Sequence, residues 1–228
     1  VGNYAFRVDP TAPGAADGRT WRTAYHTLQE AVNAAAAAGG GQLWVAGGTL
    51  GAPLAYSEER TEAWGSPASV TGSLIMKNNV SMYGGFEGYR SGAGRQETSL
   101  DQRNRFINRV VIDGSTARSG NAAYHVIVFG AGAAGTSGAV IDGFDITGGN
   151  AAGVPGDYHT WRGGGIYNWQ SAPTISNCRI YGNTARTSGG GVSNETKLNG
   201  GAATATFVNC LFNNNTATRD LDGLTPTN

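Results

Sequence analysis

Cysteine, histidine and charged residues are scarce in this chain of 228 residues. It has two Cys, three His and 14% charged residues, and its formal net charge at pH 7 is zero. Because no cluster of Lys and Arg stands out, the composition argues against nucleic acid or an anionic membrane surface as the main partner. No stretch of 18 apolar residues occurs, so we expect no membrane-spanning helix. His26, His125 and His159 are too scattered to indicate a metal site, and we expect no cofactor.

Glycine, by contrast, is abundant, and the chain contains an internal repeat. Its 37 glycines and many short apolar stretches are typical of a turn-rich all-β protein. Residues 163–185 (GGGIYNWQSAPTISNCRIYGNTA) and 189–217 (GGGVSNETKLNGGAATATFVNCLFNNNTA) both open with GGG and close with an NC motif followed by NTA. The spacer between the motifs changes length while the motifs do not. This pattern predicts the stacked coils of a solenoid, in which insertions lie at a corner.

The repeat also predicts which side chains stack in the core. Alternate residues around each NC motif are apolar, which is the period of a strand with one buried face. We therefore expect Cys178 to stack on Cys210, and Ile180 on Phe212, each pair one strand spacing apart. A weaker copy of the motif occupies residues 139–151, at an offset of about 34 residues.

Asparagine and glycine recur at the bends of the predicted coils. Gly149, Asn183 and Asn215 are expected to form tight bends, because both residue types tolerate left-handed backbone. Stacked Asn side chains are expected to hydrogen-bond along the column. Cys178 and Cys210 would be within Cα reach of a disulfide, but parallel side chains are poor geometry for that bond. The pattern favours two unbridged thiols and leaves a disulfide open.

A single amphipathic helix is predicted near the start of the chain. Thr27 and Glu30 match a capping box, Leu28 and Val32 share an apolar face, and glycines follow at 39–40. We expect this helix to cover the apolar end of the first coil. Short strands are expected at residues 4–8, 42–46, 73–76, 80–83, 109–112, 125–129 and 139–146, with polar loops at 51–67 and 88–109.

These elements predict one domain over residues 1–228. Residues 1–40 would hold the first strand and the capping helix, residues 41–218 the coils with loop insertions, and residues 219–228 an irregular tail. The sequence offers no second capping helix after the last coil, so the open end predicts either a continuing chain or contact with another subunit.

The repeats and the N-terminal half resemble a known group of proteins. GGGI and GGGV followed by IYGN and FNNN resemble the repeats of the chlamydial polymorphic outer membrane proteins. The segments DGRTWRTAYHTLQEAV, LWVAGGTL, VSMYGGFEG and ETSLDQR resemble the opening of bacterial surface-exposed pectin-lyase-like β-helix proteins. The resemblance implies a right-handed single-stranded parallel β-helix that is extracellular, at the cell surface or periplasmic, often in adhesion. The shared motifs are structural and carry no catalytic residue across.

Clustered carboxylates, which polysaccharide lyases and hydrolases of this architecture need, are few in the sequence. Asp113, Asp142 and Asp145 are the candidates. Asp142 and Asp145 have opposite parity, so one strand cannot present both to one face. Asp220 and Asp222 faintly resemble part of a calcium loop but lack its other ligands. All five aspartates are interpreted as turn or surface residues, with no catalytic and no metal-binding residue assigned.

An aromatic insertion at residues 153–169 is the stronger functional signal. Large rings on a loop that projects from a rigid solenoid can stack on sugars or contact a protein partner, although they can equally fold back over the coil. The binding candidates are Tyr158, His159, Trp161, Tyr167 and Trp169.

The sequence therefore predicts a non-enzymatic extracellular or cell-surface binding protein that makes its contacts through loops. Two alternatives stay open: a polysaccharide lyase or hydrolase, and a structural subunit of a larger assembly. Three carboxylates, or two with a basic residue, converging on one outward groove would favour the enzyme. An aromatic-bearing flat face would favour binding.

Overall fold

The computed structural model describes residues 4–62, 71–89, 97–130, 135–153, 157–196 and 203–218. Within these ranges the fold is mostly β, with a single α-helix, α1 (Leu28–Ala37), and three short 3-10 helices, η1 (Trp21–Thr23), η3 (Leu100–Gln102) and η4 (Tyr158–Trp161). The strands form four sheets, and all strand pairs within them are parallel.

The four sheets differ in their number of strands. In spatial order, the longest consists of β1 (Ala5–Val8), β2 (Gly41–Ala46), β5 (Val80–Phe86), β8 (Val140–Asp142), β12 (Thr174–Ser176) and β16 (Thr206–Val208). The five-stranded sheet consists of β17 (Leu211–Asn213), β13 (Arg179–Tyr181), β9 (Asp145–Thr147), β6 (Val110–Asp113) and β3 (Leu54–Tyr56). The four-stranded sheet consists of β15 (Val192–Glu195), β11 (Ile166–Trp169), β7 (Ile127–Phe129) and β4 (Leu74–Ile75). The last consists of β10 (Asn150–Ala151), β14 (Thr184–Ala185) and β18 (Thr216–Ala217).

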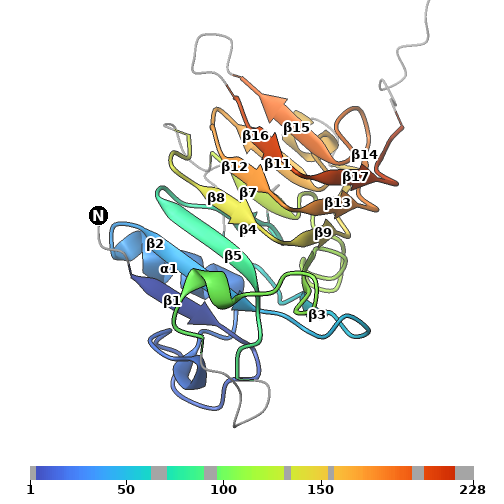
Figure 1. The fold of residues 1–228 in the computed structure, drawn as a ribbon. Coiled ribbons are helices and arrows are strands. Elements are labelled where there is room, and N and C mark those ends of the chain that lie inside the picture. Colours follow the sequence, from blue (N-terminus) through green and yellow to red (C-terminus); the bar gives the residue numbers. More distant parts are fainter. Residues whose placement is uncertain are drawn as a thin grey trace, which may run out of the picture.

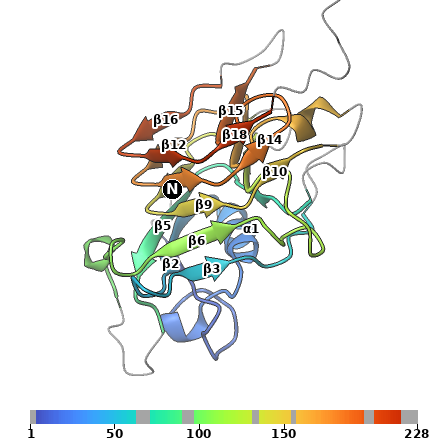
Figure 2. The ribbon, with the colours of Figure 1, turned by 90° about the vertical axis from the view of Figure 1, so that its right-hand side faces the viewer.

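The chain visits these sheets in a repeating order. From β8 onward it passes from the six-stranded sheet to the five-stranded, the three-stranded and the four-stranded sheet, and then returns to the first. Figures 1 and 2 show the result: strands far apart in sequence lie side by side, and the colours progress from blue at one end of the stack to red at the other. This arrangement of parallel sheets is compatible with a parallel β-helix.

The register predicted from the repeat is confirmed. Ile180 pairs with Phe212 at the predicted offset, and the backbone N–H of Leu211 donates to the carbonyl of Cys178 at 2.9 Å. The weaker upstream copy aligns as well, because Ile146 pairs with Ile180. The two glycine triplets hydrogen-bond to each other along the backbone. The offset between the glycine triplets is shorter than the offset between the NC motifs, because the spacer that separates triplet from NC motif is longer in the second copy.

The bends differ by one residue from the prediction. The residues with left-handed backbone are Gly148, Gly182 and Asn214, at φ of 80°, 63° and 54°, not the residues that follow them. The asparagines that follow form the predicted hydrogen-bonded column instead: the side-chain amide of Asn183 donates to Oδ1 of Asn215 at 3.1 Å. Asparagine at these positions therefore contributes side-chain hydrogen bonds, which satisfy backbone groups inside the turn.

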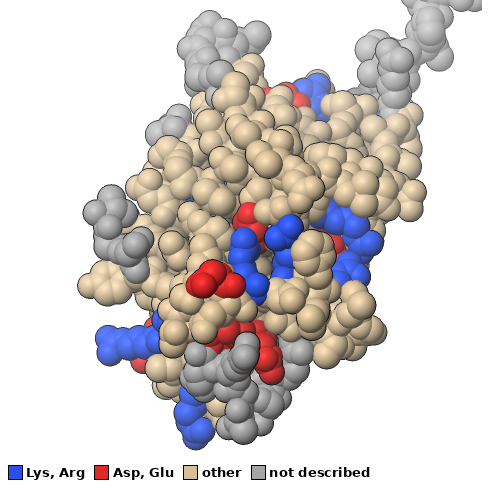
Figure 3. All heavy atoms as spheres, in the orientation of Figure 1, with Lys and Arg blue, Asp and Glu red and all other residues tan. Residues whose placement is uncertain are grey.

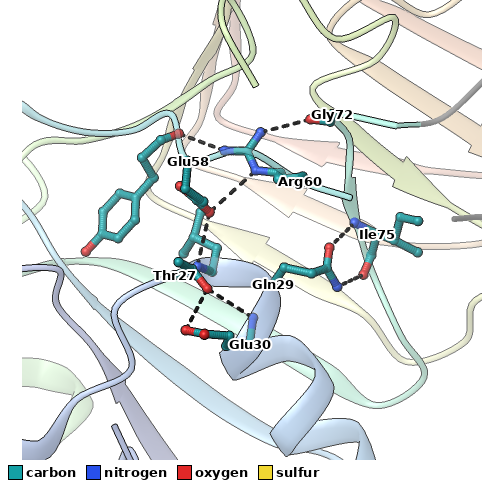
Figure 4. Close-up of polar contacts among 9 residues, drawn as sticks. Thr27, Gln29, Glu30, Glu58, Arg60, Gly72 and Ile75 are labelled. Carbon is teal, nitrogen blue, oxygen red and sulfur yellow. Dashed lines mark hydrogen bonds and ion pairs between the residues drawn. The ribbon is translucent and has the colours of Figure 1, made fainter. Parts of the chain in front are cut away.

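Helix α1 starts and packs as its sequence predicts. The Thr27 hydroxyl accepts from the backbone N–H of Glu30 at 3.3 Å, and the apolar face joins the main core through Leu28, Ala31, Val32 and Ala35. Gln29, which lies against β4, forms two hydrogen bonds with the backbone of Ile75, at 2.8 and 3.2 Å (Figure 4). These bonds occupy backbone groups of β4 at the end of its sheet, where no further strand is paired within the described ranges.

A buried arginine fixes the segment that leads away from β3. The side chain of Arg60 has no exposed surface, and its guanidinium donates to the carbonyls of Tyr56 and Gly72 at 2.7 and 3.3 Å (Figure 4). It also pairs with the Glu58 carboxylate at 3.4 Å, which in turn accepts from the backbone N–H of Leu28 at the start of α1. Glu58 thus joins the helix N-terminus to this segment, where its negative charge complements the helix dipole.

Two element predictions are corrected. Residues 51–67 are not only a polar loop, because they include β3, whose Tyr56 is buried. Residues 139–146 are not one strand but two, β8 and β9, separated by Gly143 at φ 85°. Short strands of this kind escape prediction because tertiary pairing, not local propensity, holds them. No helix in the described ranges is long and apolar enough to cross a membrane. The predicted tail, 219–228, lies outside the described residues.

Candidate functional site

The aromatic part of the predicted insertion, residues 157–169, folds back over the four-stranded sheet, while residues 154–156 lie outside the described ranges. Its η4 turn is held by Asp157, whose carboxylate accepts from the backbone N–H of His159 at 3.2 Å. Trp161 is 5% exposed, and its ring packs edge-on against Tyr158 at 4.8 Å and under the guanidinium of Arg186 at 4.6 Å. Tyr158 is 64% exposed. One ring of the turn therefore anchors it, and the other faces solvent.

The remaining candidates form a stack on the outer face of β11. Tyr167 is 1% exposed, stacks on His125 with 4.8 Å between ring centroids, and its hydroxyl lies 2.7 Å from Nδ1 of His159. Trp169 lies two residues along the strand and is half-buried, with the His159 ring edge-on at 5.1 Å. Burial raises the pKa of Tyr167. The structure thus brings all five candidates together, and leaves Tyr158, His159 and Trp169 within reach of a ligand.

His125 is enclosed beneath this stack. Its Nδ1 lies 2.9 Å from the carbonyl of Gly163, and burial lowers its pKa from 6.5 to about 4. Nε2 is buried and has no hydrogen-bond partner among the described residues. A neutral imidazole that donates from Nδ1 fits this environment, because a charged ring would have to be desolvated. His125 therefore acts as a packing residue of the sheet.

The structure also forms a groove that the sequence analysis did not identify. It has a volume of about 560 Å³ and follows the corners between the six-stranded and five-stranded sheets, crossing successive coils. It is lined by the β2–β3 turn, the loop after η3 and three corners, through Leu50, Arg105, Phe106, Arg109, Val110, Gly143, Phe144, Asp145, Asn177, Cys178, Arg179, Asn209, Cys210 and Leu211.

The repeat builds the floor of this groove. Gly143, Asn177 and Asn209 occupy the same corner position in successive coils, and all three have left-handed backbone, at φ of 85°, 53° and 52°. The amide of Asn209 donates to Asn177 Oδ1 at 2.7 Å. Non-Gly residues in this region are chiefly Asn or Asp, whose short polar side chains support it. Two of these three corner positions, Asn177 and Asn209, thus present side-chain amides to the groove.

One aspartate lines the groove and is bound by two arginines. Asp145, at the start of β9, forms ion pairs with Arg109 of the neighbouring coil on one side and with Arg179 on the other, the latter at 3.2 Å. Its side chain is 11% exposed. Both guanidinium groups contact the same carboxylate oxygen, Oδ2. Asp145 therefore holds the two arginines together at this corner.

Asp142 lies just beyond the groove lining. Its carboxylate pairs with Arg103 at 2.7 Å and accepts from the Ser176 hydroxyl and the Asn177 amide, at 2.5 and 2.8 Å. The parity argument against Asp142 and Asp145 does not apply, because Gly143 separates them into two strands whose ends both face outward at the corner. Even so, Asp145 is the only carboxylate among the described residues that line the groove. The converging carboxylates expected of a lyase or hydrolase are therefore incomplete in this lining.

The groove carries a positive charge and an apolar rim. Its lining contains three arginines against one aspartate. Arg105 stacks on Phe106 at 4.6 Å and forms no ion pair within the described part of the chain. Leu50, Phe106 and Leu211 are 66, 69 and 57% exposed. In Figure 3, Lys and Arg side chains gather near the middle of the face, over the region of β9 and β13, with acidic side chains between them.

The loop at residues 88–109, expected to be only a solvated excursion, supplies much of this site. Its last part contributes Arg105, Phe106 and Arg109, while residues 90–96 lie outside the described ranges. The sequence feature that could have indicated this site is RNRFINR, a polar segment in which arginines alternate with asparagines around an apolar pair. Composition alone does not tell which corner such a loop reaches.

The other aspartates fit a structural interpretation or lie outside the described ranges. Asp113 accepts from the backbone N–H of Ser115 at 2.8 Å, which stabilises the turn after β6. Asp220 and Asp222 lie outside the described residues. Among those residues, no group of three or more His, Cys, Asp and Glu side chains is arranged to hold a metal ion.

Comparison with known proteins identified no relative: no family model, no curated protein and no solved structure matches this chain.

Proposed function

We propose that this protein is a non-enzymatic binding protein whose corner groove takes an extended anionic ligand, with an acidic polysaccharide as the favoured class. The observation that carries the proposal is the groove itself, with three arginines against one aspartate, two corner asparagines and an apolar rim. Guanidinium groups suit carboxylate and sulfate esters because they offer paired donors, and exposed apolar side chains suit the faces of sugar rings.

The proposal includes the finer description of the fold. The repeating order of sheets and the offsets of about one coil support a right-handed single-stranded parallel β-helix, with α1 as its N-terminal cap. A groove along one corner of such a stack is straight and repeats with the coils, which fits a chain of similar units. The family resemblance of the repeats belongs to this proposal, as does an extracellular, cell-surface or periplasmic location.

The loops supply the contacts in this proposal, as the sequence predicts. Arg105 and Phe106 come from the loop after η3, and Leu50 comes from the β2–β3 turn. The aromatic insertion offers a second contact on the four-stranded sheet through Tyr158 and Trp169. Both surfaces lie on stacked strands, where long insertions commonly carry binding residues.

The alternative of a structural subunit has one observation in its favour. In the last described coil, Val208 and Phe212 are 52 and 46% exposed, although Phe212 occupies a core position of the repeat. An exposed apolar end of this kind is suited to contact with another subunit. The residues between Val208 and Phe212 also line the end of the groove, so the two surfaces adjoin.

Binding of defined polymers tests the proposal. We expect isothermal titration calorimetry to detect polygalacturonate or heparin, but not neutral dextran. Arg105→Gln is expected to weaken binding about tenfold, or ~1.4 kcal/mol, because a charge-assisted hydrogen bond is lost. Arg19→Gln is the matched control, since it makes the same change on a side chain that is 84% exposed and outside the groove.

Four results would contradict the proposal. If none of the anionic polymers binds, or if Arg105→Gln and Arg19→Gln weaken binding equally, the groove is not the site. If polygalacturonate is instead depolymerised with release of unsaturated ends, the lyase alternative replaces the binding protein. Poly-glutamate is the third probe, and its preference over both polysaccharides would show that the ligand is an acidic peptide.

A further inference from the structure

One asparagine position of the repeat joins each coil to the coil before it. Asn183 donates from its side-chain amide to the carbonyl of Ile146 at 3.1 Å and accepts from the backbone N–H of Gly149 at 3.0 Å. Asn215 repeats both bonds one coil later, with the Ile180 carbonyl at 2.7 Å and the Asn183 N–H at 3.1 Å. A single carboxamide thus satisfies one carbonyl and one N–H of the preceding coil, twice along the stack.

The last described coil offers the same carbonyl and N–H on its open side. The N–H of Leu211 donates toward β13, to the Cys178 carbonyl. Backbone groups alternate in direction along a strand, so the carbonyl of the next residue, Phe212, points away from β13. The N–H of Asn215 donates to no group within the described ranges. Together these two groups match one further carboxamide.

A second column of asparagines ends in the same way. The side-chain amide of Asn177 donates to the Asp142 carboxylate at 2.8 Å, and that of Asn209 donates to Oδ1 of Asn177 at 2.7 Å. Both bonds run from a later coil to an earlier one. Oδ1 of the exposed Asn209 is the acceptor at the end of this chain of hydrogen bonds, and polarisation along such chains strengthens the terminal acceptor.

Apolar positions of the repeat accompany these polar groups at the open end. Phe207 pairs with Ile175 and Phe212 with Ile180, and the two phenyl rings contact edge-on at 5.4 Å between centroids. Ile175 and Ile180 are fully buried, whereas Phe212 is 46% exposed. In Figure 1, β16 and β17 lie at the red end of the stack. A further coil with apolar residues at the same two positions would cover both rings.

The opposite end of the stack is not available to supply this coil from a second copy. The outer edge of β1 is already paired, because the N–H of Arg7 donates to the Gly18 carbonyl at 2.9 Å and its carbonyl accepts from the Tyr25 N–H at 2.9 Å. Helix α1 packs against the core beside it. The sequence of residues 219–228, RDLDGLTPTN, contains one asparagine and lacks the repeat pattern.

We propose that the open end of the stack binds a segment of a partner polypeptide by parallel strand addition, and that this segment carries the pattern of the repeat. The pattern is an apolar residue, Asn two residues later, an apolar residue three further on and Asn after three more, as in residues 175–183. Backbone pairing supplies affinity, and the two carboxamides and two apolar side chains supply specificity. The proposal deepens the structural-subunit alternative and does not depend on polymer binding.

A peptide with the repeat pattern tests this surface on the full chain. It has the sequence of residues 171–186, SAPTISNCRIYGNTAR, with Cys178→Ala, and it contains no acidic side chain, so it does not imitate the anionic polymer. We expect the labelled peptide to bind in fluorescence anisotropy and to protect the Asn215 N–H from hydrogen exchange. The control peptide also carries Asn177→Ala and Asn183→Ala. It is expected to bind at least tenfold more weakly, because groups at the open end lose their partners.

Substitutions in the protein locate the binding surface. Phe212→Asp is expected to weaken peptide binding at least tenfold, because it places a charge against the apolar residues of the added coil. Tyr4→Asp is the matched control and is expected to retain binding, since Tyr4 is 66% exposed and precedes β1 at the opposite end of the six-stranded sheet. Arg105→Gln is expected to retain peptide binding while polymer binding falls, so each proposal fails separately.

The peptide pair keeps the test decisive even if Phe212→Asp does not fold, because the protein is then unchanged. The proposal is wrong if the protein does not bind the peptide, or if both peptides bind equally. It is also wrong if sedimentation velocity detects a dimer that Phe212→Asp or an excess of peptide fails to leave intact, since a second copy would then cover this end.

Discussion

Ile180 of β13 lies directly in register with Phe212 of β17, yet Ile180 is fully buried and Phe212 is 46% exposed. The two residues occupy the same position of the repeat and the same strand face. They differ because Ile180 has a strand on each side, β9 and β17, whereas β17 is the last strand of its sheet in the described part of the chain. Burial in this fold is therefore set by the neighbouring coils.

This relationship predicts unequal costs for equivalent truncations. Ile180→Ala is expected to lower the free energy of unfolding by about 2–5 kcal/mol, because it leaves a cavity between two coils. Phe212→Ala removes a larger side chain but is expected to cost less than about 2 kcal/mol, since roughly half of that side chain already contacts water. Urea denaturation of both variants measures the difference. Equal costs would show that a further element covers β17 in solution.

The proposed role of α1 as an N-terminal cap is tested by charging its apolar face. Leu28 and Val32 are fully buried in the main core, so replacing both with Asp is expected to destabilise the protein by several kcal/mol. Ala37→Asp, on an exposed position of the same helix, is the control and is expected to cost under about 1 kcal/mol through the helix dipole. Unchanged thermal stability of the double variant would mean that the helix is a peripheral attachment.

The aromatic insertion is expected to separate into an anchor and a contact. Trp161→Ala removes a ring that is 5% exposed and is expected to cost about 3 kcal/mol of stability. Tyr158→Ala removes a ring that is 64% exposed and is expected to leave stability within about 0.5 kcal/mol. If the insertion binds a glycan or protein, Tyr158→Ala weakens attachment at full stability, as glycan-array binding would detect. Unchanged attachment would remove the insertion from the binding surface.

Stability is expected to fall in mild acid because of His125. Its folded pKa is about 4, below the ordinary value of 6.5, so the unfolded chain binds the extra proton between these values. The stabilisation is complete above about pH 6.5 and is lost as the pH falls toward 4, by up to about 3 kcal/mol. Asp157 and His159 are the titratable groups whose charge acts on the ring. Urea unfolding from pH 4 to 8 measures the slope, and His125→Gln is expected to flatten it. An equal slope in both proteins would assign it to other groups.

Much of the stacking was predictable from the sequence by itself. The pairing of Ile180 with Phe212, the asparagine ladder and the N-terminus of α1 follow from local patterns and from a fixed repeat offset. A coil must place its inward side chains over those of the next coil, so the offset between paired residues can be read from the repeat in the sequence. The same reasoning found the aromatic residues that meet on β11, because they are close in sequence.

Only the tertiary structure decided where the groove lies and which rings are exposed. Leu50, Arg105 and Arg179 come from distant segments, and they meet because a loop and a turn fold over one corner of the stack. The short strand β3 and the break at Gly143 likewise depend on pairing with neighbouring coils. Sequence patterns specify contacts that recur at a fixed offset. They do not specify how an insertion packs, since its position depends on the surface formed by the coils beneath it.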